Sequence, residues 1–192
     1  MTEQTAQGPG PRRGRRLSRD RLTAIGVGIV AAGLIALFVT SGTATDPRAT
    51  DTNRIVGRTA PDISATDTLG RPFRVQDYRG QWLLLNFFAT WCTPCKVEHP
   101  ELLAFSEEHK VRGDAAVASV AYNDRPGAVQ EFFAENGGDW AVVADGESNF
   151  SIEYAVLALP ESYLIDPNGR VVHKFTGGIR RGEVDAEIAK RS

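Results

Sequence analysis

The chain has 192 residues, of which 42% are hydrophobic, and a formal net charge of −2, which suits one domain of ordinary size with a sizeable core and an additional segment. The charge is unevenly spread, because residues 1–21 carry six arginines against Glu3 and Asp20, whereas residues 46–192 carry 16 basic and 22 acidic side chains. An acidic domain has no electrostatic reason to bind phosphate, so the composition excludes a nucleic-acid-binding function.

The N-terminal region has the pattern of a membrane anchor. The basic tail 1–21 is followed by 24 uncharged residues, 22–45, and about 20 helical residues suffice to cross a membrane. Arginines before such a helix keep that end in the cytoplasm, so we expect a single-pass signal anchor in the cytoplasmic membrane with the remainder on the extracytoplasmic side. A cleaved signal peptide is the alternative, with Gly42-Thr43-Ala44 as a weak cleavage site. A polar linker, 46–59, then leads to a folded domain over 60–192.

Strand and helix patterns alternate within this domain. Two short strands around Leu69-Gly70 predict an N-terminal β-hairpin, and Gln81–Phe88 is an almost continuous apolar run, typical of a strand buried on both faces. The other predicted elements, in chain order, are a helix over 94–110, a strand over 115–122, a helix over 126–135, a strand over 141–144, a short helix over 149–154, a hairpin of strands 162–165 and 171–175, and a helix over 182–190. This order predicts an α/β fold in which helices flank a mixed sheet.

The only two cysteines, Cys92 and Cys95, form a C-x-x-C motif where the buried strand gives way to the next helix. Free N–H groups and the dipole at a helix N-terminus stabilise a thiolate, here at Cys92. Pro94 fits the first helical turn, where its missing N–H costs nothing. Because the second cysteine lies three residues on and on the same helical face, the motif suits a reversible dithiol–disulfide couple.

Two other interpretations of the motif are weaker. A disulfide between residues this close closes a small loop and adds little stability through chain entropy. Cys92, Cys95 and His99 could together bind zinc, but a structural zinc site needs a fourth ligand and the chain has no further cysteine. We therefore predict no metal site and no cofactor.

Two stretches carry a resemblance to a known family: NFFATWCTPCKVEHP at residues 86–100 and LPESYLIDPNG at residues 159–169. Together they resemble the membrane-anchored, extracytoplasmic, thioredoxin-like thiol–disulfide reductases of the TlpA, ResA and CcmG group, which act in cytochrome c maturation. The W-C-x-P-C pattern after an apolar strand is highly specific for the thioredoxin fold, and the assignment to the maturation group is less specific. The resemblance implies a thioredoxin-like domain with the N-terminal hairpin as an extension.

The resemblance also implies roles for individual residues. It makes Cys92 an exposed nucleophile and Cys95 a buried resolving thiol of a redox-active disulfide. Glu98 matches an acidic residue beneath the active site, where it would disfavour negative charge on sulfur and relay a proton; a solvated acid near the start of a helix is the alternative. Pro160 becomes a cis-proline facing the disulfide, although an X–Pro bond is trans on base rates alone. The substrate-binding residues implied by the resemblance are Trp91, Pro94, Leu159 and Pro160.

By the same resemblance the chain is an enzyme that reduces disulfides of protein substrates outside the membrane. Apocytochrome c is the expected client, and a membrane protein of the CcdA or DsbD type is the expected electron donor. An extracytoplasmic disulfide oxidase or isomerase would carry the same motif, so the direction of electron flow stays open. A copper-delivery module of the Sco type is an alternative of another class, but that family resembles C-x-x-x-C with a histidine near the position of Pro160. Leu159 stands close to where the reductases have a glycine, which leaves the client open.

Overall fold

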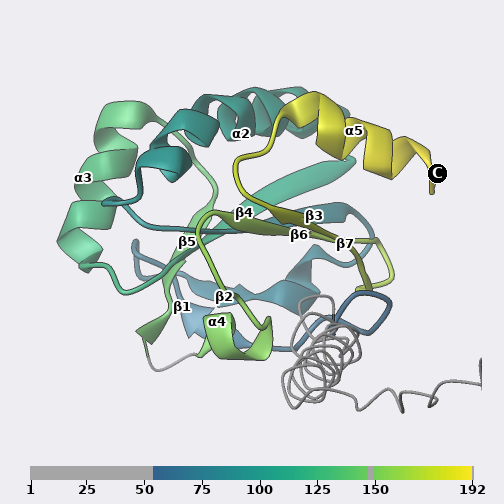
Figure 1. Ribbon diagram of the computed structural model, residues 1–192, viewed down its shortest axis with the longest axis horizontal. Helices are drawn as coiled ribbons and strands as arrows, with labels where there is room; N and C mark the ends of the chain where they lie inside the picture. The colour runs from purple at the N-terminus through teal and green to yellow at the C-terminus, as the bar shows by residue number, and fades with distance from the viewer. Residues whose placement is uncertain (1–53, 147–148, 192) are drawn as a thin grey trace, which may run out of the picture. The chain divides into compact units, whose positions relative to one another are not determined.

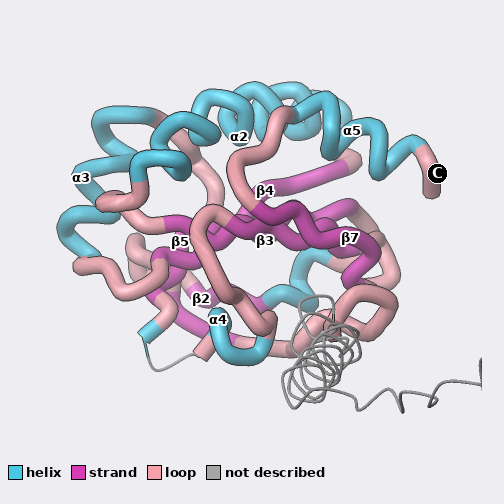
Figure 2. Tube along the Cα trace, viewed as in Figure 1, coloured by secondary structure: helices cyan, strands magenta, loops and turns pink. Residues whose placement is uncertain are grey.

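The computed structural model describes residues 54–146 and 149–191. The strands are β1 (Ser64–Thr66), β2 (Pro72–Arg74), β3 (Trp82–Phe88), β4 (Ala115–Ala121), β5 (Ala141–Ala144), β6 (Glu161–Ile165) and β7 (Val171–Thr176). The helices are the 3₁₀ helix η2 (Val75–Tyr78) and the α-helices α2 (Thr93–Arg112), α3 (Pro126–Asn136), α4 (Phe150–Glu153) and α5 (Arg181–Ala189) (Figures 1 and 2). All the predicted strands and helices of the domain are therefore present, and η2 is an addition that the sequence patterns did not predict.

The predicted anchor and basic tail, 22–45 and 1–21, lie outside the described residues. Within 54–146 and 149–191, no helix combines the length and the apolar character that crossing a membrane requires.

A five-stranded mixed sheet forms the centre of the domain, in the order β5-β4-β3-β6-β7. β3 pairs in parallel with β4, and β4 with β5, whereas β6 runs antiparallel to both β3 and β7. The mixed sheet predicted from the order of elements is thus confirmed. The carboxyl end of β3 and the amino end of β6 meet at one edge of the sheet, where Phe87 is paired with Glu161.

The central strand β3 is buried along its whole length because both faces of the sheet are covered. Leu84 and Phe88 belong to the core beneath α2, α3 and α5, while Leu83, Leu85 and Phe87 belong to the core on the opposite face. Figure 1 shows the three long helices on one side of the sheet and the β1–β2 hairpin with α4 on the other. Right-handed crossovers from β3 to β4 and from β4 to β5 advance in the same direction, which puts α2 and α3 on the same face.

The N-terminal hairpin is a separate two-stranded antiparallel sheet, as predicted. Its residue Phe73 is 3% exposed and contacts the rings of Tyr78 and Phe150. Packing begins before Ala60, the predicted start of the domain. Ile55 is buried, and backbone hydrogen bonds join residues 57–60 to the turn before β7 and to the first residue of β7. The last residues of the predicted linker therefore belong to the packed fold.

Candidate active site

The two cysteines lie where β3 leads into α2, and they form a disulfide with their Cα atoms 5.3 Å apart. Cys92 is the N-cap residue of α2, and its Sγ accepts a hydrogen bond of 3.3 Å from the backbone N–H of Cys95. Pro94 occupies the first turn, as the sequence predicts. In the reduced state the same N–H group and the helix dipole favour a thiolate on Cys92.

The expectation that Cys92 is exposed is wrong for this disulfide-bonded state. Cys92 is 6% exposed and Cys95 is 3% exposed. Both sulfurs belong to the core that α2 forms with the sheet, because the bond holds Cys92 against the first turn of the helix. Cys92 nevertheless remains the more accessible of the two.

Glu98 lies one turn further along α2 and is buried, with 2% of its surface exposed. One carboxylate oxygen accepts a hydrogen bond of 2.7 Å from the side-chain amide of Asn86, and the other accepts one of 3.1 Å from the backbone N–H of Ile179. The Asn86 amide also donates to the hydroxyl of Ser162 at 3.0 Å. The buried position expected from the resemblance is therefore observed, and the solvated alternative is excluded.

Burial raises the pKa of Glu98 to about 7, against the hydrogen bonds from Ile179 and Asn86, which lower it. Burial disfavours the carboxylate because it removes water, whereas N–H donors stabilise it. A carboxyl group that titrates near neutral pH can both take and return a proton at the pH where the disulfide chemistry runs.

Pro160 lies at the edge of the sheet that carries the disulfide. The Leu159–Pro160 peptide bond is cis, as the resemblance implies and against the base rate for X–Pro bonds. Pro160 is buried and directly precedes β6, whose partner β3 leads to Cys92. Leu159 is half-buried and packs against the core that contains both cysteines.

Three large apolar side chains are exposed in the segments that flank the ends of β3, β4 and β6 near the disulfide. Trp91, next to the disulfide, is 59% exposed, and its indole N–H donates to the carbonyl of Asn123 at 3.4 Å. Tyr122 and Leu157, which follow β4 and precede β6, are exposed as well. Large exposed apolar side chains around a reactive group are typical of a site that binds protein.

Asn86 and Ser162 were not predicted as site residues. A signal for Asn86 was present, since an asparagine inside an apolar strand has to satisfy its amide in the core. Ser162 carried no comparable signal, because a serine at the start of a strand is ordinary.

His99, considered as a third metal ligand, is engaged elsewhere. Its Nε2 lies 3.0 Å from the carbonyl oxygen of Gly137, and its ring contacts those of Phe132, Phe133 and Trp140. Burial lowers the pKa of His99, which favours the neutral ring. Across residues 54–146 and 149–191, no three His, Cys, Asp or Glu side chains are grouped as metal ligands would be.

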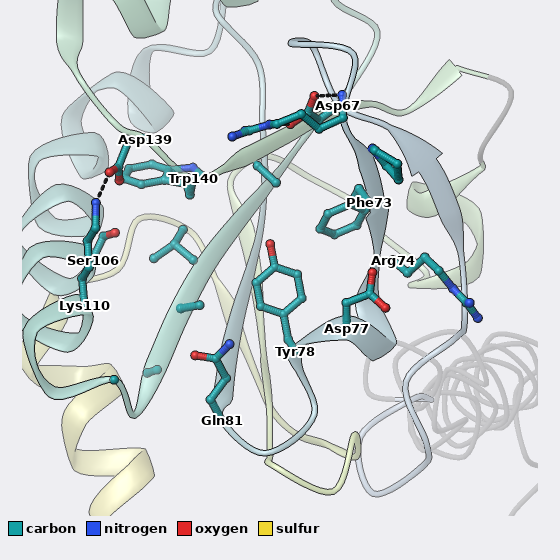
Figure 3. Close-up of a pocket in the computed structure, with 17 residues that line it drawn as sticks. Asp67, Phe73, Arg74, Asp77, Tyr78, Gln81, Ser106, Lys110, Asp139 and Trp140 are labelled. Carbon is teal, nitrogen blue, oxygen red and sulfur yellow. Dashed lines mark hydrogen bonds and ion pairs between the residues drawn. The ribbon is translucent and has the colours of Figure 1, made fainter.

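A hollow of about 510 Å³ lies beside the second half of α2, away from its first turn and the cysteines. Figure 3 shows Tyr78 and Gln81 beside it, with Lys110 paired to Asp139 on the opposite wall. Its acidic and basic side chains are balanced, and neither cysteine lines it.

Comparison with known proteins agrees with this geometry. The family model described as Redoxin matches residues 55–190. The chain is 33% identical to the thiol-disulfide oxidoreductase ResA of Geobacillus kaustophilus over 133 residues, which cover 69% of this chain and 76% of the relative. It is 30% identical to the thiol:disulfide interchange protein HelX of Rhodobacter capsulatus over 164 residues, covering 83% and 89% of the two chains.

The fold is also that of solved structures. A thiol:disulfide interchange protein of the thioredoxin family from Chlorobium tepidum superimposes with a TM-score of 0.63 at 24% identity, covering 69% of this chain and 94% of that one. StoA from Bacillus subtilis gives a TM-score of 0.59 at 20% identity, covering 67% and 97%. The chain therefore belongs to the Redoxin family, as a thioredoxin-like thiol–disulfide oxidoreductase of the TlpA, ResA and CcmG type.

Proposed function

We propose that this oxidoreductase works as a reductase of protein disulfides outside the cytoplasmic membrane, with apocytochrome c as its client. The observation that carries the proposal is the buried carboxyl group of Glu98, whose pKa is raised to about 7, one turn along α2 from Cys95. A base of that pKa is suited to deprotonating the resolving thiol. The role in cytochrome c maturation is supported by the sequence resemblance to the reductase group.

The proposed reaction begins with the reduced protein. The Cys92 thiolate attacks one sulfur of a client disulfide, the client's second sulfur leaves as a thiolate and takes a proton, and a mixed disulfide forms. Glu98 accepts the proton of the Cys95 thiol, and the Cys95 thiolate then attacks Cys92 and releases the client's first sulfur, which takes that proton. Two electrons pass to the client, and the protein is left with the Cys92–Cys95 disulfide.

The client is proposed to bind as an extended segment beside the disulfide. The Leu159 backbone next to the cis-proline would pair with the client as an added strand does. We expect Trp91, Pro94 and Pro160 to border the same position, and the exposed Trp91 ring offers apolar contact area.

The protein must be reduced again after each turnover. We propose that residues 22–45 anchor it in the cytoplasmic membrane, where a donor of the CcdA or DsbD type supplies two electrons. Tethering both proteins in one membrane raises their effective concentration.

The test is a cell in which Cys92→Ser replaces the wild-type protein. We expect less covalently bound haem, because haem attachment needs reduced thiols in its client, and an added small-molecule thiol should restore it. Cys95→Ser should instead accumulate a mixed disulfide through Cys92, from which the client can be identified. If the Cys92→Ser cell lacks disulfides in exported proteins and an added oxidant rescues it, the protein is an oxidase.

The reduction potential of the couple gives an independent measure of direction. A reductase is expected near the value of thioredoxin, about −270 mV, and an oxidase near that of DsbA, about −120 mV.

A further inference from the structure

A buried ion pair involves the residue that follows the cis-proline. Glu161 follows Pro160 and begins β6, and Lys174 lies on the neighbouring strand β7. Glu161 Oε2 lies 2.9 Å from Lys174 Nζ, and each side chain is only 2% exposed. The Lys174 ammonium lies 5.3 Å from the centre of the Tyr163 ring. Residues 154–159, which lead to the proline, are called the pre-proline segment below.

This ion pair is poorly suited to stabilising the fold. An ammonium group has three N–H donors, yet Lys174 Nζ is buried and makes no well-oriented hydrogen bond with any residue that the structure describes. Its charge is compensated by its closeness to Glu161 and to the face of the Tyr163 ring. Burying two charges is costly, and an apolar pair of similar size is often at least as stable. The position of the pair beside Pro160 points to a role in the site.

The carboxylate of Glu161 also contacts the pre-proline segment. Glu161 Oε2 accepts a hydrogen bond of 3.4 Å from the backbone N–H of Leu157. The hydroxyl of Tyr163 donates to the carbonyl of Tyr154 at 2.6 Å. That hydroxyl also lies 3.3 Å from Glu161 Oε2, but it has a single proton, which the shorter contact to Tyr154 takes. Two side chains of β6 therefore bind two backbone groups of the pre-proline segment.

We propose that Glu161 is a positioning residue for client binding, because it fixes the pre-proline segment so that Leu159 presents its backbone to an extended client. The inference rests on the proposed function, since it requires a client that pairs with Leu159. The side chain of Leu157 is 70% exposed, and Leu159 packs against the core that contains both cysteines. A shift of the segment would therefore displace the surface on which the client lies.

Three variants of the full chain test this role. Glu161→Met/Lys174→Met removes the acceptor of the Leu157 N–H and both buried charges together, so that no charge is left uncompensated. Glu161→Gln/Lys174→Met also removes the charges but keeps a carbonyl oxygen as acceptor. Asp62→Asn/Arg74→Met is the matched control, because it neutralises an exposed ion pair of 3.0 Å on the hairpin side of the domain.

Each variant is assayed with two disulfides. One is a peptide that contains an oxidised C-x-x-C-H sequence, and the other is 5,5′-dithiobis(2-nitrobenzoic acid), which has no peptide backbone. In the double methionine variant we expect KM for the peptide to rise about tenfold, as for the loss of one hydrogen bond, with an unchanged rate on the small disulfide. The glutamine variant and the control should keep the wild-type KM. The Leu157 amide should exchange its hydrogen about tenfold faster only in the double methionine variant.

Three results would overturn the inference. An unchanged peptide KM in the double methionine variant overturns it and leaves the proposed function in place. An equal rise in both double variants overturns it too, because the buried charge and not the acceptor would then matter. A wild-type protein that reduces the small disulfide but not the peptide contradicts the proposed function, and the inference with it. If the double methionine variant does not fold, Leu157→Pro removes the same N–H, and its KM for the peptide is expected to lie about tenfold above that of Leu157→Ala, which loses the exposed side chain but keeps the N–H.

Discussion

At the scale of single residues, burial and hydrogen bonding act in opposite directions on Glu98. Its folded pKa of about 7 lies above the ordinary value of 4.5, so the folded state keeps the proton to higher pH than the unfolded state. The contribution of this carboxyl to stability is therefore complete below pH 4.5 and is lost as the pH rises through 7, a loss of about 3 kcal/mol. We expect Glu98→Gln to abolish this decrease, measured by urea unfolding of the oxidised chain at pH 5 and pH 8. The exposed Glu107→Gln on the same helix is the control, and a glutamine variant with the wild-type pH dependence would contradict the assignment.

Asn86 acts on the same carboxyl through its amide. Its hydrogen bond favours the carboxylate, so Asn86→Leu should raise the pKa of Glu98 further. With Glu98 neutral over a wider pH range, the thiol pKa of Cys92 should fall, as it should in Glu98→Gln. The pH profile of Cys92 alkylation in the reduced protein measures this shift. Ser162→Ala is the control, since it leaves the hydrogen bond between Asn86 and Glu98 in place. If the alkylation profiles of Asn86→Leu and Glu98→Gln equal that of the wild type, the carboxyl group of Glu98 does not influence Cys92.

At the scale of secondary-structure elements, α2 serves different purposes at its two ends. Its first turn carries the disulfide, whereas the last turn is joined to neighbouring elements by His109, whose side chain is 3% exposed. The His109 ring lies 2.6 Å from a carboxylate oxygen of Asp114, just before β4, and 2.9 Å from one of Asp185 in α5. The ring therefore connects three elements of the fold.

We expect His109→Ala to lower the free energy of unfolding by about 2–3 kcal/mol, because it leaves a cavity and two carboxylates without their shared partner. The neighbouring variant Lys110→Ala removes an exposed ion pair with Asp139, which is worth about 0.2–1 kcal/mol. Urea unfolding of both variants measures the difference. The reduction of a small disulfide should be unchanged in both, since the first turn of α2 is not involved. Equal stability losses would show that the His109 contacts contribute no more than an exposed pair.

At the scale of the whole molecule, the arginine-rich tail and the uncharged residues 22–45 predict a protein that is anchored in the cytoplasmic membrane, with its thioredoxin-like domain outside the cytoplasm. Alkaline extraction of membranes should leave the full-length chain in the pellet, because a helix that spans the bilayer is not released by raising the pH. Quantitative release of a shortened chain would instead identify Gly42-Thr43-Ala44 as a cleavage site.

The sequence by itself determined the main strands and helices and the pairing of Cys92 with Cys95, because both depend on residues that are neighbours in the chain. An almost continuous apolar run such as β3 is typical of a strand covered on both faces. The Asp166–Gly169 turn joins β6 to β7 because aspartate, proline and glycine favour a tight reversal. The C-x-x-C spacing brings two sulfurs together across one helical turn wherever a helix begins there. These features therefore followed from local residue type and spacing.

Only the tertiary structure decided the environment of the couple. Burial within the tertiary structure raises the pKa of Glu98, and the two donors that lower it lie 12 and 81 residues away, so neither influence is local. The accessibility of Cys92 depends on the core around α2. Lys174, whose charge predicts a solvated position, is buried beside Glu161 of the adjacent strand. Local sequence favours a trans bond before Pro160, and its cis form was expected only from the resemblance. These properties come from contacts between segments distant in the chain, whose free energies outweigh local preference.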